Sequence, residues 1–343
     1  MNRARKSAGG GLGAVLLVCS IQAMAEQAHE PVNLQENEGV QQLIDEVAAQ
    51  GVPEAWLRHA FAEANYSQGV LDAMDGAAER RLRWFEYRDI FLTRQRIEEG
   101  AAFMQVHADT LARAEEVYGV PGSVVTAIIG VETYYGRHKG QHRVLDSLST
   151  LAFYHPSRGD FFRGELAAFL EIAYEQEVDP AELYGSYAGA MGYPQFIPTS
   201  YQAYAVDFDG DGHRDLWENS VDAIGSVANY FAEHGWQRGG AVYHEATGPE
   251  ELPEALVFNQ TSAPSITVAD VKAVGIEPQE SLDDTLRVVP LAFEMDEEHT
   301  RYRLGENNFY VITRYNHSHL YAMAVAELAE AIEQQVEQVE EQG

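Results

Sequence analysis

Val120-Pro-Gly-Ser-Val-Val-Thr-Ala-Ile-Ile-Gly-Val-Glu132-Thr-Tyr-Tyr-Gly136 is the stretch on which the fold prediction depends. Its apolar side chains leave almost no polar face, so it predicts a short helix that is buried on all sides. Pro121 and Ser123 are start signals, and Gly136 suits the position just past the end. Glu132 then lies in the last turn, where burial and the helix dipole are both expected to raise the pKa of its carboxyl. A raised pKa suits a general acid that works near neutral pH.

The alternative interpretation of Glu132 is structural. A buried carboxylate can pair permanently with an arginine, and Arg137 and Arg163 are the candidates. Because buried ion pairs also perturb pKa values, this stretch alone leaves both interpretations open.

The N-terminus has the pattern of a secretory signal peptide. The chain has 343 residues, 45% of them hydrophobic, which suits a globular protein of two or three domains. Three cations, Arg3, Arg5 and Lys6, precede an apolar run and the sequence Ala23-Met-Ala25. This pattern predicts cleavage before Glu26 and export of the mature protein. No later stretch approaches the roughly 18 apolar residues of a transmembrane segment, so we expect none.

The single cysteine, Cys19, lies inside the predicted signal peptide. It could carry a lipid anchor, but Val18 before it is a poor fit for the small residue usually found there. Plain cleavage is the favoured prediction, and it leaves a mature chain without disulfides.

The net charge limits the possible partners. The whole chain carries a formal charge of -31, and removal of Arg3, Arg5 and Lys6 with the signal would take it to -34. So negative a surface argues against nucleic acid or anionic lipid as a partner.

Helical spacing dominates both ends of the chain. It runs from Val40 to Met74 and returns in three further segments. These are 77–92, 101–118 and 161–174. Trp84 is interpreted as a core residue, and Asp146 as the N-cap of a helix over 147–153. The C-terminal segment 317–340 is again predicted to be helical.

Small residues are concentrated in the segment Gly185-Ser-Tyr-Ala-Gly-Ala-Met-Gly192-Tyr-Pro-Gln195-Phe-Ile-Pro-Thr-Ser200. They allow close approach of either a ligand or another stretch of backbone. Ser186 and Gln195 are polar groups in this close-packed setting. A binding loop and a tight helix crossing are both compatible with the pattern.

An acidic segment has the spacing of an EF-hand calcium loop. Asp207, Asp209 and Asp211 occupy positions 1, 3 and 5, and glycine occupies position 6. His213 at position 7 would supply its backbone carbonyl, and Glu218 stands at position 12. Asp222, just beyond the loop, is an alternative to Glu218 as the closing ligand. A solvated acidic turn is the other interpretation, and a single structural Ca²⁺ site is the one we favour.

A small β-rich region is predicted after residue 240. Short strands are indicated at 265–268 and 285–293. A hairpin is predicted to pair 302–304 with 309–315 around the Gly305-Glu-Asn-Asn308 turn.

Taken together, these motifs resemble the membrane-bound lytic murein transglycosylase B family. The resemblance covers roughly Tyr87 to Val325. It is carried by six segments in one order: Gly130–Gly136, Gly185–Gly192, Gln195–Ser200, Asp207–Trp217, Asp222–Phe231 and Tyr315–Ser318.

The resemblance implies an α+β fold that is mainly α. It comprises a lysozyme-like helical core with an EF-hand-like loop, an all-helical domain and a small β domain. The expected divisions are 1–25 signal peptide, 26–118 N-terminal helical domain, 119–240 catalytic core with the calcium loop, 241–314 β-rich domain, and 315–343 return to the core and helical domain.

The resemblance also implies an activity, cleavage of the β-1,4 bond between N-acetylmuramic acid and N-acetylglucosamine in peptidoglycan. The residue at the position of Glu132 would be the sole catalytic acid and base. Glycan strands would be bound by seven further residues, Tyr87, Ser186, Gln195, Tyr230, Tyr315, Asn316 and Tyr321. The implied setting is the periplasm, with the protein expected to be a monomer and lipid anchoring less favoured.

Two alternative functions remain at this point. A hydrolytic muramidase would use the same glutamate with water as the nucleophile, and ordinary glycosidases use two carboxylates where only one is convincing here. A non-catalytic, calcium-dependent peptidoglycan-binding protein would use the groove without turnover.

Overall fold

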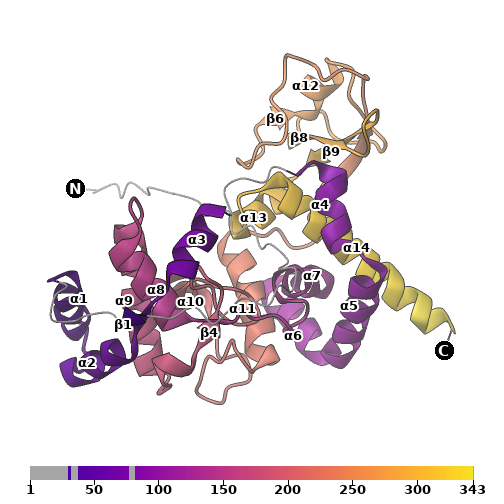
Figure 1. Cartoon of the computed structure of the whole chain (residues 1–343). Helices are drawn as coiled ribbons and strands as arrows, with labels where there is room; N and C mark the ends of the chain where they lie inside the picture. The colour runs from indigo at the N-terminus through magenta and orange to yellow at the C-terminus, as the bar shows by residue number, and fades with distance from the viewer. Residues whose placement is uncertain (1–29, 32–37, 77–81, 343) are drawn as a thin grey trace, which may run out of the picture. The chain divides into compact units, whose positions relative to one another are not determined.

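The computed structural model describes residues 30–31, 38–76 and 82–342 (Figure 1). The predicted signal peptide and Cys19 lie outside these residues. The described chain forms two compact units, each built from separated stretches. The first unit contains 82–97 and 234–342, and the second contains the described residues up to 76 together with 98–233. Within the described residues, no helix combines the length and apolarity needed to cross a membrane.

The second unit is mainly helical. Helix α8 (Val144–Tyr154) packs along α9 (Gly159–Glu175), and α10 (Pro198–Tyr204) also packs on α9. Helix α11 (Ser220–Glu233) packs against α6 (Ala108–Tyr118) and α7 (Gly122–Thr133). The helices are connected by two short antiparallel pairs, β1 (Glu30–Pro31) with β2 (Asn65–Tyr66) and β3 (His142–Arg143) with β4 (Tyr184–Gly185), and by the 3-10 turn η1 (Pro180–Glu182). The other helices of this unit are α1 Glu38–Ala48, α2 Glu54–Glu63 and α3 Gln68–Gly76. Helix α5, Arg94–Val106, begins in the stretch assigned to the first unit and continues in the stretch assigned to the second.

The predicted helical run from Val40 to Met74 is broken into three helices, α1, α2 and α3. Gly51 adopts a φ of +106° and Pro53 precedes α2 in an extended conformation. Glycine accepts that φ without a steric cost, and proline cannot continue a preceding helix. The first break therefore had a sequence signal that the apolar spacing concealed.

The prediction that Asp146 caps a helix at its N-terminus is wrong. Helix α8 already begins at Val144, so Asp146 lies in its first turn. One carboxylate oxygen accepts a hydrogen bond from the backbone N–H of Asn65 at 2.9 Å, and the other lies 3.2 Å from Nη1 of Arg143. Asp146 thus ties the β2 segment to α8.

The first unit contains an antiparallel sheet. In the described residues its strand order is β6 (Ile266–Thr267), β8 (Arg287–Glu294), β9 (Thr300–Gly305), β5 (Tyr243–Thr247) and β7 (Glu277–Pro278). Buried residues on one side of it form a small core with Val268, Val271, Ile276, Val288, Tyr302 and Leu304. The elements are α4 Trp84–Phe91, β5 Tyr243–Thr247, β6 Ile266–Thr267, α12 Val268–Lys272, β7 Glu277–Pro278, β8 Arg287–Glu294, β9 Thr300–Gly305, α13 Asn307–Tyr315 and α14 His319–Gln342. The predicted strands at 265–268 and 285–293 correspond to β6 and β8.

The predicted hairpin partner over 309–315 is wrong, because these residues form helix α13. Strand β9 pairs instead with β8 and β5. Phe309, Ile312 and Thr313 are buried at the spacing of one helix face. The buried Asn308 amide donates to the backbone carbonyls of Gln237 at 2.9 Å and Gly240 at 2.8 Å, which fixes the start of the helix. Its β-branched and aromatic residues mimicked a strand.

A buried ion network joins α4, α14 and the sheet within the first unit. Arg303 on β9 is 2% exposed, and its guanidinium lies 2.6 Å from Glu327 and 2.9 Å from Glu245. The second oxygen of Glu327 accepts a hydrogen bond from Arg88 at 2.9 Å. Trp84 is buried against Phe293 at 5.1 Å, which confirms it as a core residue.

Candidate active site

The Glu132 helix is buried along its whole length, as predicted. Every residue of α7, from Gly122 to Thr133, is buried, and Glu132 itself is 7% exposed. The two arginines considered as permanent partners bind other carboxylates. Arg137 lies 2.7 Å from Glu99, and Arg163 lies 3.8 Å from Glu46.

Directly after Glu132 the chain reverses sharply. Helix α7 ends at Thr133, two residues before the predicted end, and Tyr134, Tyr135 and Gly136 all have positive φ values, of 52°, 59° and 86°. The Thr133 hydroxyl accepts a hydrogen bond from the Gly136 N–H at 3.0 Å. A Cβ at Gly136 would lie 2.0 Å from the Tyr193 ring, so only glycine fits there.

Tyr193 connects this reversal to the acidic loop. The Thr133 hydroxyl is 3.1 Å from the carbonyl oxygen of Tyr193, and the Tyr193 N–H donates to the Leu216 carbonyl at 2.9 Å. The Lys139 ammonium lies 4.9 Å from the centre of the Tyr193 ring and 2.9 Å from the Glu218 carboxylate. The backbone next to Glu132 is therefore held by contacts from residues far away in the sequence.

The small-residue segment is a loop, so the interpretation as a tight helix crossing is wrong. Isolated antiparallel bridges join Gly185 to Met191 and Met191 to Phe196. A Cβ at Gly185 would lie 2.2 Å from the Ala190 carbonyl oxygen, and one at Gly192 would lie 2.2 Å from that of Leu216. The small residues are needed because backbone packs directly against backbone.

Ser186, Gln195 and Tyr230 lie in the same unit as Glu132. The Ser186 hydroxyl accepts a hydrogen bond from the Ala190 N–H at 3.0 Å. Gln195 has a φ of 50°, and its side-chain amide donates to the Gly192 carbonyl at 2.8 Å. Tyr230 on α11 is 7% exposed and contacts Phe196, the residue after Gln195, with ring centres 5.6 Å apart.

The other four residues predicted to bind glycan lie in the first unit. Tyr315 and Tyr321 stack with ring centres 6.4 Å apart and planes 10° from parallel, at the junction of α13 and α14. Asn316 lies between those helices and is buried, and its carbonyl accepts the Ser318 N–H at 2.7 Å. Tyr87 is half-buried on α4, 5.1 Å from Phe91.

The acidic loop brings carboxylate oxygens together. Carboxylate oxygens of Asp207, Asp209 and Asp211 lie within 4.8 Å of one another. Asp207 accepts N–H groups from Gly212 at 2.8 Å and Gly210 at 2.7 Å, which lower the pKa of its carboxyl. Hard oxygens at alternate loop positions fit Ca²⁺.

The candidates for the rest of the metal site differ in their surroundings. The fully buried Asp222 accepts the N–H of Phe208 at 2.8 Å on one oxygen and that of Asp215 at 2.9 Å on the other. The Glu218 side chain is 80% exposed and paired with Lys139. His213 is exposed and donates its N–H to Asp211 at 2.8 Å.

The sequence did not predict the contacts by which Thr133 and Tyr193 hold the backbone that follows Glu132. Both residues stand inside recognised motifs, but the contact between them joins residues 60 positions apart in the chain. An aromatic residue among glycines, at Gly192-Tyr193, was the available signal.

The described residues form a mainly helical α+β protein, with a buried glutamate near the end of α7 and a loop in which carboxylate oxygens cluster. Residues 35–330 match the transglycosylase SLT domain family. The membrane-bound lytic murein transglycosylase B of Escherichia coli K12 is 41% identical over 307 residues, covering 86% of this chain and 83% of that protein.

Solved structures agree. Soluble lytic transglycosylase SltB1 from Pseudomonas aeruginosa matches with a TM-score of 0.81 at 47% identity, over 86% of this chain and 98% of that chain. The Escherichia coli lytic transglycosylase Slt35 in complex with calcium matches with a TM-score of 0.81 at 41% identity, over 90% and 96% of the two chains. The chain belongs to the transglycosylase SLT domain family and has its lysozyme-like fold.

Proposed function

We propose that this protein is a lytic transglycosylase that cleaves the β-1,4 bond between N-acetylmuramic acid and N-acetylglucosamine in peptidoglycan. One observation carries the proposal: Glu132, 7% exposed, ends a helix in which every residue is buried, and the chain reverses directly after it. The family and the lytic transglycosylases matched above agree with it.

In the proposed reaction Glu132 acts first as an acid and then as a base. Its carboxyl gives a proton to the leaving glycosidic oxygen while the N-acetyl group of the muramic acid stabilises the positive charge that develops at C1. The carboxylate then takes the proton of the C6 hydroxyl as that oxygen bonds to C1. The product is a 1,6-anhydro sugar, and no water is consumed. Since the nucleophile belongs to the same molecule, little entropy is lost in bringing it to C1.

We assign Thr133, Tyr193 and Gly136 a positioning role in this reaction. The Thr133 hydroxyl and the Tyr193 ring fix the backbone that follows Glu132. A catalytic carboxyl has to be held to within a fraction of an ångström, because even a small displacement lowers the reaction rate.

Seven residues are proposed to bind the glycan strand: Tyr87, Ser186, Gln195, Tyr230, Tyr315, Asn316 and Tyr321. Aromatic faces suit sugar rings, and amide and hydroxyl groups suit their polar substituents. In this chain, the Tyr315 and Tyr321 rings stack on each other, and the Ser186 hydroxyl is hydrogen-bonded within its own loop. Both contacts support the proposal that these side chains are held rigidly before the glycan binds.

We propose one structural Ca²⁺ ion in the acidic loop, held by Asp207, Asp209, Asp211 and the His213 carbonyl. The closing ligand is Glu218 or Asp222. The bound ion would supply charge neutralisation for the clustered carboxylates. We further propose export to the periplasm as a monomer, with plain signal cleavage favoured over a lipid anchor at Cys19.

The mass of the products tests the reaction. Purified sacculi digested with the enzyme should yield fragments with anhydro ends, which lack one water relative to reducing ends. Reducing ends alone would replace the proposal by a hydrolytic muramidase. Binding of sacculi without any soluble product would replace it by a non-catalytic binding protein.

A further inference from the structure

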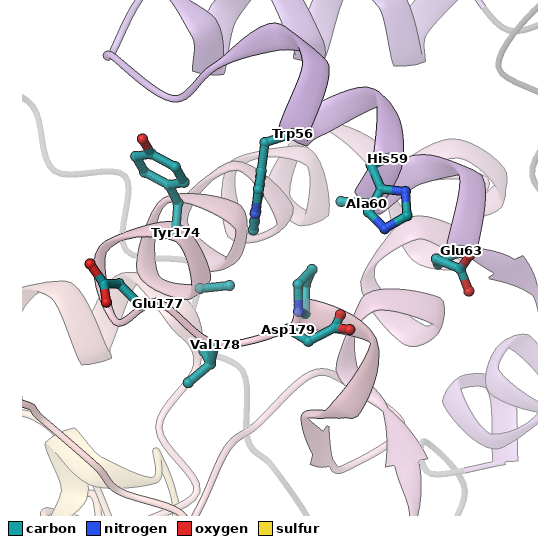
Figure 2. Close-up of a pocket in the computed structure, with 10 residues that line it drawn as sticks. Trp56, His59, Ala60, Glu63, Tyr174, Glu177, Val178 and Asp179 are labelled. Atoms are coloured by element: carbon teal, nitrogen blue, oxygen red, sulfur yellow. The ribbon is translucent and has the colours of Figure 1, made fainter.

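A pocket of about 360 Å³ opens between α2 and the C-terminal end of α9 in the second unit (Figure 2). None of the described residues that line it belongs to α7, to the 185–197 loop or to the acidic loop. It is formed by Trp56, His59, Ala60, Glu63, Ala173, Tyr174, Glu177, Val178, Asp179 and Pro180.

An aromatic pair forms one wall of this pocket. Trp56 from α2 and Tyr174 from α9 meet edge to face, with ring centres 5.5 Å apart and planes at 70°. Tyr174 is 38% exposed, so part of its ring is open to a ligand. Figure 2 shows the Trp56 ring between Tyr174 and His59, above Val178 and Asp179. The faces of such rings attract cations through their quadrupole.

The charges around the aromatic pair have one sign. Glu63, Glu177 and Asp179 line the pocket and are exposed, and among its described lining residues there is no lysine or arginine. Asp179 has one oxygen occupied by the Ala181 N–H at 2.9 Å, which leaves Glu63 and Glu177 as the freer carboxylates. Aromatic faces bordered by carboxylates suit a cation attached to an apolar stem.

We propose that this pocket binds a lysine or arginine side chain of a basic protein partner. The methylene stem would pack on Trp56 and Val178, and the cationic head would meet the Tyr174 ring and the Glu177 carboxylate. The net charge of -31 would attract such a partner over a distance, and the pocket would give it a point of attachment. This binding is independent of the proposed cleavage by Glu132.

Fluorine NMR on the mature protein labelled with 5-fluorotryptophan tests the proposal. The chain has four tryptophans, so Trp84, Trp217 and Trp236 serve as internal references, and Trp56→Phe assigns the pocket signal. The probes are acetyl-Gly-Lys-Gly-amide, its arginine counterpart, and the same peptide with the lysine amine acetylated. We expect the two cationic peptides to shift the Trp56 signal saturably and the acetylated peptide to bind at least about fivefold more weakly.

Matched variants separate a local contact from general charge. Glu177→Gln should weaken lysine-peptide binding about threefold, whereas Glu182→Gln, an equal charge change on η1 outside the pocket, should leave it nearly unchanged. Glu177 has a φ of 56°, so Glu177→Gly removes the carboxylate while it relieves the backbone. That variant should bind as weakly as Glu177→Gln without a lower melting temperature.

Three results would overturn the proposal. These are a Trp56 signal that does not saturate with either cationic peptide, equal affinity for the acetylated peptide, and equal effects of Glu177→Gln and Glu182→Gln. A chito-oligosaccharide and an amine-bearing muropeptide form the comparison arms. Tighter binding of either one than of the lysine peptide would make the pocket a glycan-strand site and refute the protein partner.

Discussion

Glu132 and the aspartates of the acidic loop belong to the same helical unit, but their surroundings are opposite. Glu132 is a single carboxylate in a helix whose every residue is buried. Asp209 and Asp211 are exposed, and with Asp207 they bring oxygens within 4.8 Å of one another. Burial in an apolar setting favours the protonated form of a carboxyl, whereas clustering at the surface favours a bound cation. This difference in surroundings is the reason for proposing proton transfer at Glu132 and metal binding at the aspartates.

Substitution of the buried acid should have the largest effect. Glu132→Gln is expected to lower the rate of peptidoglycan cleavage by at least about 10²–10⁴-fold, because the amide cannot replace the proposed proton donor. The melting temperature should not fall, since the amide is neutral and nearly isosteric. Release of soluble fragments from sacculi measures the rate.

A second buried glutamate in the same unit provides the control. Glu165 is 3% exposed, and desolvation raises its pKa against hydrogen bonds from Thr199. Its carboxylate accepts the Thr199 N–H at 3.0 Å and hydroxyl at 2.8 Å. Glu165→Gln should lower stability and spare most activity. An equal loss of activity in both variants would show that burial alone does not distinguish Glu132.

The turn after Glu132 should give the next largest effect. Gly136→Ala places a Cβ at a φ of 86° and 2.0 Å from the Tyr193 ring, so we expect about a tenfold loss of kcat together with a lower melting temperature. Gly164→Ala on α9 is the control, because outside the helix's own nearby backbone no atom lies within 4 Å of the added Cβ. Full activity of Gly136→Ala would remove the positioning role of Tyr193.

Calcium should stabilise the protein through the clustered aspartates. At a free concentration a hundredfold above Kd, mass action contributes about 2.7 kcal/mol, or roughly 5–10 °C in melting temperature. Asp207→Asn should abolish most of this shift. Calorimetric titration of Glu218→Gln and Asp222→Asn identifies the closing ligand, since its loss should weaken binding more. An unchanged melting temperature between chelated and calcium-loaded protein would contradict the site.

The smallest effect is expected in the first unit, where two carboxylates flank a histidine. His244 lies 2.6 Å from Glu280 and 2.5 Å from Glu306. Desolvation lowers the pKa of His244, but the hydrogen bonds and charges of both carboxylates outweigh it and raise the pKa overall. Its contribution to stability is therefore complete below about pH 6.5, the ordinary histidine value, and is lost as pH rises through the raised pKa. Melting curves of His244→Gln and the unaltered protein should converge over that range; parallel curves would refute the assignment.

Periodicity in the sequence predicted the elements that are buried on a regular pattern. It identified α7, α9 and α14, and it placed β6 and β8. It failed at 309–315, where β-branched residues suggested a strand but Asn308 and the burial pattern specify a helix. Local propensity cannot reveal that β9 already has neighbours on both sides.

The parts of the candidate site that depend on residue type and spacing could be predicted from the sequence. Glu132 and the three aspartates stand out by burial pattern and spacing. The contacts from Thr133 to Tyr193 and from Asp222 to the loop were not predictable, since they join residues separated in sequence by a path that only the fold determines. The pocket at Trp56 and Tyr174 was missed for the same reason.

The hydrogen bonds of Asp222 bear on whether folding comes before calcium binding. Its carboxylate holds the N–H groups of Phe208 and Asp215, which lie near opposite ends of the acidic loop. The loop is thereby shaped by the protein's own hydrogen bonds, and little conformational entropy is left for an ion to remove. We expect the chain to fold in a calcium-poor medium and to bind the ion afterwards, at a loop that already has its native conformation. Metal scarcity would then cost the protein heat resistance without preventing its folding.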